Sequence, residues 1–199
     1  MKILYFFGDS TTLGVGDMES GGWPVRLTAL LSQEGLFSSP DTIYNLGVRK
    51  DSSDMIAKRW KKEFNSRVIE RTQACLLFCF GTVDAAAPHG SMNIPVGESA
   101  ANARTILVNA SQAGKTIFIS PFPVRDDAHR QRIETLCTAY SSICKAINVP
   151  YIDIFHQLNC PQFLDDLADG VHPEAVGNQL IATLLAANSC LKDICRTPN

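Results

Sequence analysis

Short apolar runs that end abruptly at a glycine constrain the fold of this chain more than any other feature. Residues 3–7 are Ile-Leu-Tyr-Phe-Phe and stop at Gly8, and residues 74–80 form a similar run that stops at Gly81. A continuous apolar run of this length is typical of a strand buried on both faces, as in a parallel sheet covered by helices. Further strands are predicted at 42–47, 115–120 and 151–155.

Segments with helical periodicity separate these runs. One of them places Met55, Ile56, Trp60, Phe64 and Val68 at steps of about four, which predicts a helix with one buried side. Other helices are predicted to open at Gly21–Pro24, to end at Gly114, to cover about 127–148 and to start at His172–Pro173. Strand and helix alternate five times, which predicts a five-stranded parallel sheet between helices, a three-layer α/β/α sandwich. The 199 residues suit one well-buried core, so we expect a single domain over 1–199.

Charge and cysteine usage narrow the classes of function. The formal net charge is −2, which gives no electrostatic reason to expect nucleic acid or an anionic membrane as a partner. The seven cysteines include no Cys-x-x-Cys pair, and the four histidines show no metal-ligand spacing, so no metal site is predicted. Met1-Lys2 opens no secretory signal, and we therefore expect a cytoplasmic protein with reduced thiols.

Polar residues follow three of the predicted strands, and one more polar group lies late in the chain. In a parallel sheet the carboxyl ends of the strands share one edge, which is where open α/β sheets bind ligands. Ser10, Gly47, the Gly81 turn and the segment from Asp169 to His172 are expected to meet there. A serine hydroxyl needs an adjacent base, itself oriented by a third group, to act as a nucleophile. The set predicts a Ser-His-Asp arrangement.

Each of these signals has a plainer interpretation when taken alone. Asp9 and Ser10 could simply cap a loop through local hydrogen bonds, which Asp and Ser often do. An Asp-x-x-His sequence such as Asp169 to His172 is usually structural. Only the combination of both motifs in one chain favours catalysis.

Four sequence blocks, taken together, resemble a known family. Gly8-Asp9-Ser10 follows the first strand, Asn45-Leu46-Gly47 the second and Gly81-Thr82-Val83-Asp84 the third, while Asp169-Gly170-Val171-His172-Pro173 lies near the end. In this order, and over nearly the whole chain, they look like the four conserved blocks of the SGNH, or GDSL-type, hydrolases. The resemblance implies a flavodoxin-like three-layer sandwich and hydrolysis of esters or thioesters without a cofactor.

Carried over position by position, the resemblance implies that Ser10 is the nucleophile, His172 the base and Asp169 the residue that orients the base. It also implies that the backbone N–H groups of Ser10 and Gly47 donate to the oxyanion. Residues of the first and third blocks are expected to contact the substrate: Asp9, Gly81, Thr82 and Val83.

Position 83 departs from the pattern, because the family has Asn where this chain has Val83. That amide is a third oxyanion donor, and losing one such donor costs about 10²- to 10³-fold in kcat. The enzyme could be slow, another donor could replace the amide, or the protein could bind without catalysing. We favour replacement by Arg49, two residues beyond Gly47, because a guanidinium offers several donors. An ordinary surface arginine is the alternative.

Three other functions compete with an SGNH esterase. A flavin-binding electron carrier would use the Ser/Thr-rich loop after the first strand to hold a phosphate, but Asp9 would repel that phosphate. An α/β-hydrolase needs a Gly-x-Ser-x-Gly elbow, and residues 97–101 lack the second glycine. A non-catalytic ligand binder of the same fold is supported by Val83 alone.

The irregular segment from Thr82 to Gly97 is long enough to be functional, since structureless loops of this length are uncommon in compact domains. Its small residues predict an exposed site without a large lid. We therefore expect a small-molecule ester as the partner, with short acyl or acetyl groups preferred to long lipid chains.

Overall fold

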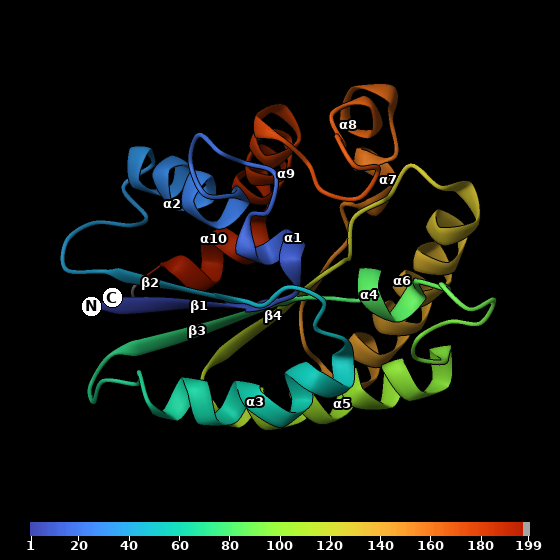
Figure 1. Ribbon diagram of the computed structural model, residues 1–199. Coiled ribbons are helices and arrows are strands. Elements are labelled where there is room, and N and C mark those ends of the chain that lie inside the picture. Colours follow the sequence, from blue (N-terminus) through green and yellow to red (C-terminus); the bar gives the residue numbers. More distant parts are fainter. Residues whose placement is uncertain (197–199) are drawn as a thin grey trace.

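The computed structural model describes residues 1–196 and contains one five-stranded parallel sheet (Figure 1). The strands are β1 (Lys2–Gly8), β2 (Thr42–Gly47), β3 (Gln73–Cys79), β4 (Lys115–Ile119) and β5 (Tyr151–Ile152). Their order in the sheet is β2-β1-β3-β4-β5, and every neighbouring pair is parallel. This is the strand order of flavodoxin-like sheets, which confirms the predicted fold class.

Helices cover both faces of the sheet, as Figure 1 shows. One face packs against α3 (Ser53–Asn65), α5 (Val96–Ala113) and α6 (Asp127–Ile147). The other packs against α2 (Trp23–Gln33), α8 (Pro161–Asp165), α9 (Ala175–Ala187) and α10 (Ser189–Cys195). Three helices of a single turn complete the chain, namely α1 (Ser10–Leu13), α4 (Thr82–Ala85) and α7 (Phe155–Leu158).

The alternation of side chains along β1 divides the core in two. Ile3, Tyr5 and Phe7 point to the α3/α5/α6 side, whereas Leu4 and Phe6 point to the α2/α9 side. All five are fully buried, because successive side chains of a strand face opposite sides and both sides are covered here. This explains why the run is apolar throughout rather than alternating.

Several local expectations are wrong. Met55 and Val68 are about half exposed, and Val68 lies beyond the end of α3, so neither lines the inner side of that helix. The predicted fifth strand is cut short, because Phe155 begins α7. Pro173 does not open a helix: it forms an isolated bridge with Leu167 before α9 starts, and α10 follows later.

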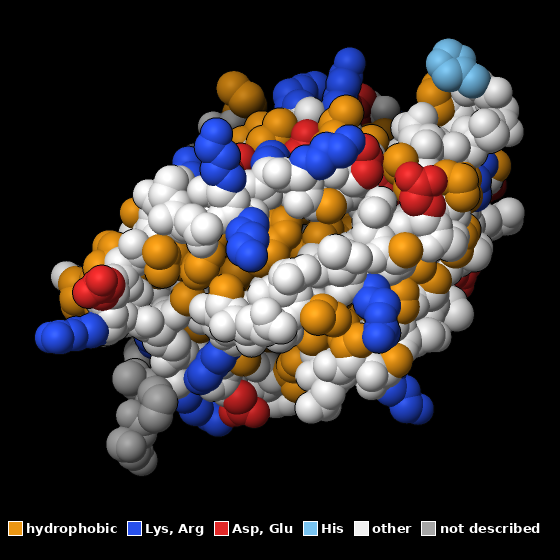
Figure 2. Space-filling view, turned by 90° about the horizontal axis from the view of Figure 1, so that it is seen from below, with side chains coloured by type: hydrophobic (Ala, Val, Ile, Leu, Met, Phe, Trp, Pro, Cys, Tyr) orange, Lys and Arg blue, Asp and Glu red, His pale blue; other side chains and the backbone are white. Residues whose placement is uncertain are grey.

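The outer surfaces carry scattered charges. Figure 2 shows the molecule from the side of α3 and α5, where the central and lower Lys and Arg side chains are separated from one another by apolar and neutral ones. Within residues 1–196, no helix combines the length and apolar character needed to cross a membrane.

Candidate active site

Ser10 lies at the carboxyl end of β1, where it is the first residue of the single-turn helix α1. Asp9 caps this turn, because its Oδ1 accepts hydrogen bonds from the backbone N and the Oγ1 of Thr11, each at 2.8 Å. Gly14 ends the turn in the left-handed region, with φ of 93°. An N-cap acceptor and a left-handed glycine are the ordinary start and stop signals of a helix.

Two glycines let this turn approach the strand ends closely. A Cβ on Gly8 would lie 2.1 Å from Oγ1 of Thr12 in α1, and one on Gly47 would lie 2.3 Å from the backbone N of Leu13. Both distances are impossible for real atoms, so any other residue would push α1 away from the sheet. The glycines that end β1 and β2 therefore fix where Ser10 stands.

The segment from Asp169 to His172 reaches the same edge from the loop before α9. Asp169 Oδ1 accepts the backbone N–H groups of Val171 at 3.0 Å and His172 at 2.8 Å, which shapes the turn. The loop around Gly16 packs against it, since a Cβ there would lie 2.6 Å from the carbonyl oxygen of Pro173. Two segments far apart in sequence are thus held together by backbone packing.

These parts bring three side chains into one hydrogen-bonded series. His172 Nε2 lies 2.7 Å from Ser10 Oγ, and His172 Nδ1 lies 2.6 Å from Asp169 Oδ2. Partial burial raises the pKa of Asp169, but hydrogen bonds from the His172 ring and from two backbone N–H groups outweigh it and lower the pKa to about 2. An ionised carboxylate only accepts, so the proton sits on Nδ1 and leaves Nε2 free to accept from the serine hydroxyl.

A cavity of about 350 Å³ opens over Ser10 and His172. Its wall comes from the loops after β2 and β3, the start of α6 and the loop before α9. The lining residues are Ser10, Arg49, Lys50, Thr82, Val83, Ala86, Asn93, His129, Val171 and His172. Two expected contact positions, Thr82 and Val83, are among them, and so is Arg49.

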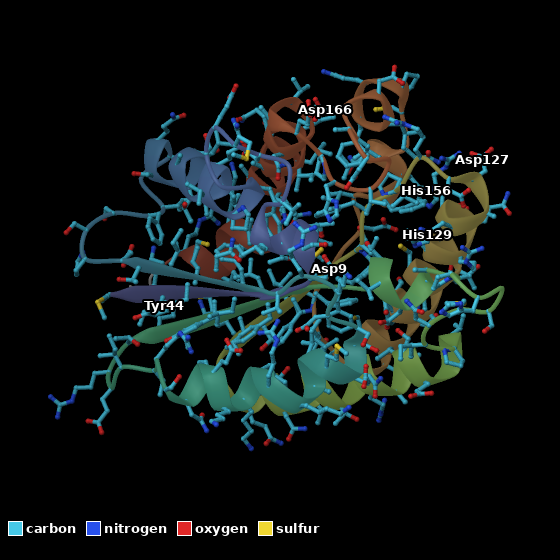
Figure 3. The ribbon with its side chains drawn as sticks, in the orientation of Figure 1. Asp9, Tyr44, Asp127, His129, His156 and Asp166 are labelled. Carbon is cyan, nitrogen blue, oxygen red and sulfur yellow. The ribbon has the colours of Figure 1, made fainter. Side chains whose placement is uncertain are left out.

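Three other expected site residues stand behind this wall. Asp9, labelled near the start of α1 in Figure 3, is only 1% exposed and does not line the cavity. Gly81 does not line it either, and its backbone lies against Tyr140 and Pro121. Gly47 is likewise absent from the wall, and its N–H donates to the side-chain oxygen of Asn45 at 3.1 Å.

The cavity wall also contains residues that the sequence did not single out. Lys50 adopts a left-handed conformation with φ of 67°, and none of the described residues accepts its N–H. The side-chain amide of Asn93 donates to the carbonyl oxygen of Val83 at 2.9 Å. Neither feature has a signal in the sequence, because a lysine rarely adopts this conformation and Asn93 lies in an irregular segment.

His129, labelled beside α4 in Figure 3, is the second histidine of the cavity. Its Nε2 lies 2.8 Å from the carbonyl oxygen of Thr82, so that nitrogen must carry a proton. Burial lowers the pKa of His129, which favours its neutral form. The position of His129 at the start of α6 is fixed by Asp126, whose side chain accepts the N–H of His129 and caps the helix. An Asp in this place indicates the start of a helix, but it does not indicate that His129 lines a cavity.

Within residues 1–196 no group of three or more His, Cys, Asp or Glu side chains is placed to hold a metal ion. All seven cysteines are free thiols.

The GDSL-like Lipase/Acylhydrolase family matches residues 6–180. No curated protein matches the chain significantly. Among solved structures, the lipase/acylhydrolase from Enterococcus faecalis is 25% identical, with a TM-score of 0.76 and 94% of each chain covered.

Two more distant structures share the fold. The acetylxylan esterase Axe2 from Geobacillus stearothermophilus is 16% identical, with a TM-score of 0.76 and 96% of each chain covered. LAE5, an alpha/beta hydrolase enzyme from the metagenome of Lake Arreo in Spain, is 19% identical, with a TM-score of 0.75 and 96% of each chain covered.

Proposed function

Because the chain belongs to the GDSL-like lipase/acylhydrolase family, and is therefore a carboxylic ester hydrolase, we propose that Ser10 is its nucleophile, His172 its base and Asp169 the residue that orients the base. The series of hydrogen bonds of 2.7 Å and 2.6 Å that joins these three side chains carries the proposal. The arrangement meets the geometric requirement for an activated serine.

The reaction follows from the direction of these hydrogen bonds. Ser10 Oγ attacks the ester carbonyl while His172 Nε2 takes the hydroxyl proton, and the carbonyl oxygen becomes an oxyanion. The imidazolium, stabilised by the ionised Asp169, then gives the proton to the departing alcohol or thiol. Water attacks the acyl-serine by the same route, which releases the acid and restores Ser10.

The oxyanion needs donors that are fixed before the reaction. We assign the N–H groups of Ser10 and Lys50, because both residues line the cavity and no described residue accepts the Lys50 N–H. Gly47 is less suitable, since its N–H already donates to Asn45. Arg49 was expected to replace the missing amide, but its side chain is exposed and no hydrogen bond of the described residues fixes it. The amide of Asn93, held on Val83 O, is a better-fixed replacement.

The cavity supports small acyl groups. Its volume of about 350 Å³ is near the lower end of the range for small-molecule sites, and Val83, Ala86 and Val171 give it a short apolar surface. We therefore propose short-chain esters or thioesters as substrates. The flavin-carrier alternative does not fit the family. A weak or inactive member is the remaining alternative, and Val83 is the observation that favours it.

Hydrolysis of a short-chain p-nitrophenyl ester tests the nucleophile. The Ser10→Ala protein should lose about 10³-fold or more in kcat, because no other group can form the acyl intermediate. Ser20→Ala, at an exposed serine outside the cavity, is the matched control and should keep wild-type activity. A fluorophosphonate should add one covalent label to wild type and none to Ser10→Ala. Equal hydrolysis by both serine variants would contradict the proposal.

Replacing Asn93 by Ala tests the oxyanion assignment. Loss of one donor to the transition state should lower kcat by about 10- to 10²-fold with little change in KM, since a replacement donor on an exposed loop is worth less than a buried one. Steady-state kinetics on the same ester measure both constants. An unchanged kcat would remove Asn93 from the mechanism.

A further inference from the structure

The wall of the Ser10 cavity contains two cations and no carboxylate. Arg49 and Lys50 are consecutive, exposed and part of this wall. The chain as a whole carries a formal charge of −2, so this positive charge is local to the site. A cavity lined by one sign of charge attracts ligands of the opposite sign.

Neither cation is neutralised by a partner. Among residues 1–196, no carboxylate forms an ion pair with Arg49 or Lys50, and no hydrogen bond involves either side chain. The acidic side chains nearest in sequence are already engaged, Asp51 with Arg59 at 2.5 Å and Asp54 with Lys58 at 2.8 Å. Asp169, the acidic member of the site, is occupied by His172. The positive charge at the cavity therefore stays free for a ligand.

The strand order separates this charge from the apolar part of the cavity. β2 and β3 pair with opposite edges of β1, the strand that leads to Ser10. Arg49 and Lys50 follow β2, whereas Val83 and Ala86 follow β3. An ester whose carbonyl carbon lies at Ser10 thus extends one part toward an apolar wall and the other toward two cations.

We propose that the preferred substrates are esters or thioesters whose leaving group carries a carboxylate or phosphate, which Arg49 and Lys50 bind while the acyl group lies against Val83 and Ala86. The inference rests on the proposed function, because it takes Ser10 as the attacking residue. Guanidinium groups bind both kinds of anion in bidentate geometry, and ammonium groups bind them as point charges. Because both side chains are exposed, the attraction is modest and falls as salt is added.

Three acetyl esters with the same ring test the charge of the leaving group: 3-acetoxybenzoate, 3-acetoxyphenyl phosphate and the neutral 3-acetoxybenzamide. Each enzymatic rate is divided by the hydroxide-catalysed rate of the same ester, which corrects for differences in leaving-group reactivity. At low salt, kcat/KM for ester cleavage should be about tenfold higher for the two anionic esters than for the neutral ester, 3-acetoxybenzamide. In 1 M NaCl the difference should nearly vanish, because screening then acts over about 3 Å. The two anionic arms show whether carboxylate or phosphate is bound better.

The double variant Arg49→Gln/Lys50→Asn removes both charges from the wall. Asn is chosen at position 50 because it tolerates the left-handed conformation found there and keeps the backbone N–H. The ratio of anionic to neutral kcat/KM should fall to about one. Lys61→Gln/Lys62→Gln removes the same charge from exposed positions on α3, the helix on the face shown in Figure 2, and should keep the wild-type ratio.

The outcomes separate this inference from the proposed function. The leaving-group assignment would be overturned if the ratio of anionic to neutral kcat/KM were near one in wild type, or if it were unchanged in the Arg49→Gln/Lys50→Asn variant. Ser10-dependent cleavage of the ester bond of 3-acetoxybenzamide would still stand in either case. An equal loss on all three esters would also overturn it, since the side chains would then act on the reacting carbonyl. If Ser10→Ala hydrolyses 3-acetoxybenzamide as fast as wild type, the proposed function itself fails.

Discussion

Asp9 and Ser10 are neighbours in sequence but have different environments. Ser10 faces the cavity, whereas Asp9 is turned into the protein and has one carboxyl oxygen, Oδ2, without a hydrogen-bond partner among the described residues. Burial raises the pKa of Asp9 to about 6, although hydrogen bonds from Thr11 oppose the shift. A buried carboxyl that favours its protonated form makes folding stability depend on pH.

The Asp9→Asn protein should reveal this dependence. Below about pH 3 the Asp9 carboxyl is protonated in the folded and unfolded states alike, so its contribution to stability is fully present. As the pH rises to about 6, Asp9 ionises in the unfolded chain before it does so in the folded protein. The free energy of unfolding of wild type therefore falls by on the order of 2–3 kcal/mol. Asn cannot ionise, so the variant should not show this loss.

Urea unfolding of both proteins at pH 4 and pH 7 measures the effect. The free energy of unfolding of the variant, minus that of wild type, should increase between the two values. Asp17 and Asp169, whose pKa values are lowered to about 2, act at lower pH and cancel in the difference. A difference that does not change with pH would show that Asp9 is ionised in the folded protein.

At the scale of elements, a buried polar network fixes α4, the single turn that carries Thr82 and Val83. Asp84 is fully buried in α4, and its Oδ1 accepts the backbone N–H of Ser53 at the start of α3. Its other oxygen accepts from the Ser99 hydroxyl of α5, which also lies 2.5 Å from the hydroxyl of Tyr140 in α6. One hydrogen-bonded network centred on this carboxylate therefore joins four helices, with α6 linked to it through Ser99.

Replacing Ser99 by Ala should destabilise the protein more than replacing Tyr140 by Phe. Ser99→Ala leaves both an Asp84 oxygen and the Tyr140 hydroxyl without that partner, which should cost about 2–3 kcal/mol. Tyr140→Phe removes one hydrogen bond and its hydroxyl together, which should cost about 1 kcal/mol. Denaturant unfolding measures both values.

Ser111→Ala provides the control for this network. Ser111 lies in the same helix, α5, but is exposed and bonds only to the carbonyl oxygen of Leu107 in the preceding turn. Its replacement should change stability by less than about 0.5 kcal/mol. If Ser99→Ala were equally harmless, the network would not hold α4 in place.

At the scale of the whole molecule, the site depends on the order of the strands. β1 lies between β2 and β3, so the loops that follow these two strands flank Ser10 on both sides. Arg59 of α3 reinforces this edge, because it donates to Asp51 in the loop after β2 and to the carbonyl oxygen of Gly8. The same order that makes the sheet thus builds a cavity with a cationic side and an apolar side.

The sequence by itself determined the sheet, because apolar runs, glycine stops and helical periods are local properties of the chain. Ser10, His172 and Asp169 could be proposed from their motifs, since a parallel sheet brings its carboxyl-end loops to one edge. Local patterns did not reveal the short helices α7 and α8, whose formation depends on packing against the rest of the fold.

Only the tertiary structure decided which residues line the cavity. Ser10 and His172 are 162 residues apart, and the contact between them depends on how the loops pack rather than on either sequence motif. The same packing turns Asp9 inward and brings Lys50, Asn93 and His129 to the cavity wall. Side-chain periodicity records which side of an element is buried, but contacts between distant loops form only when the whole chain has folded.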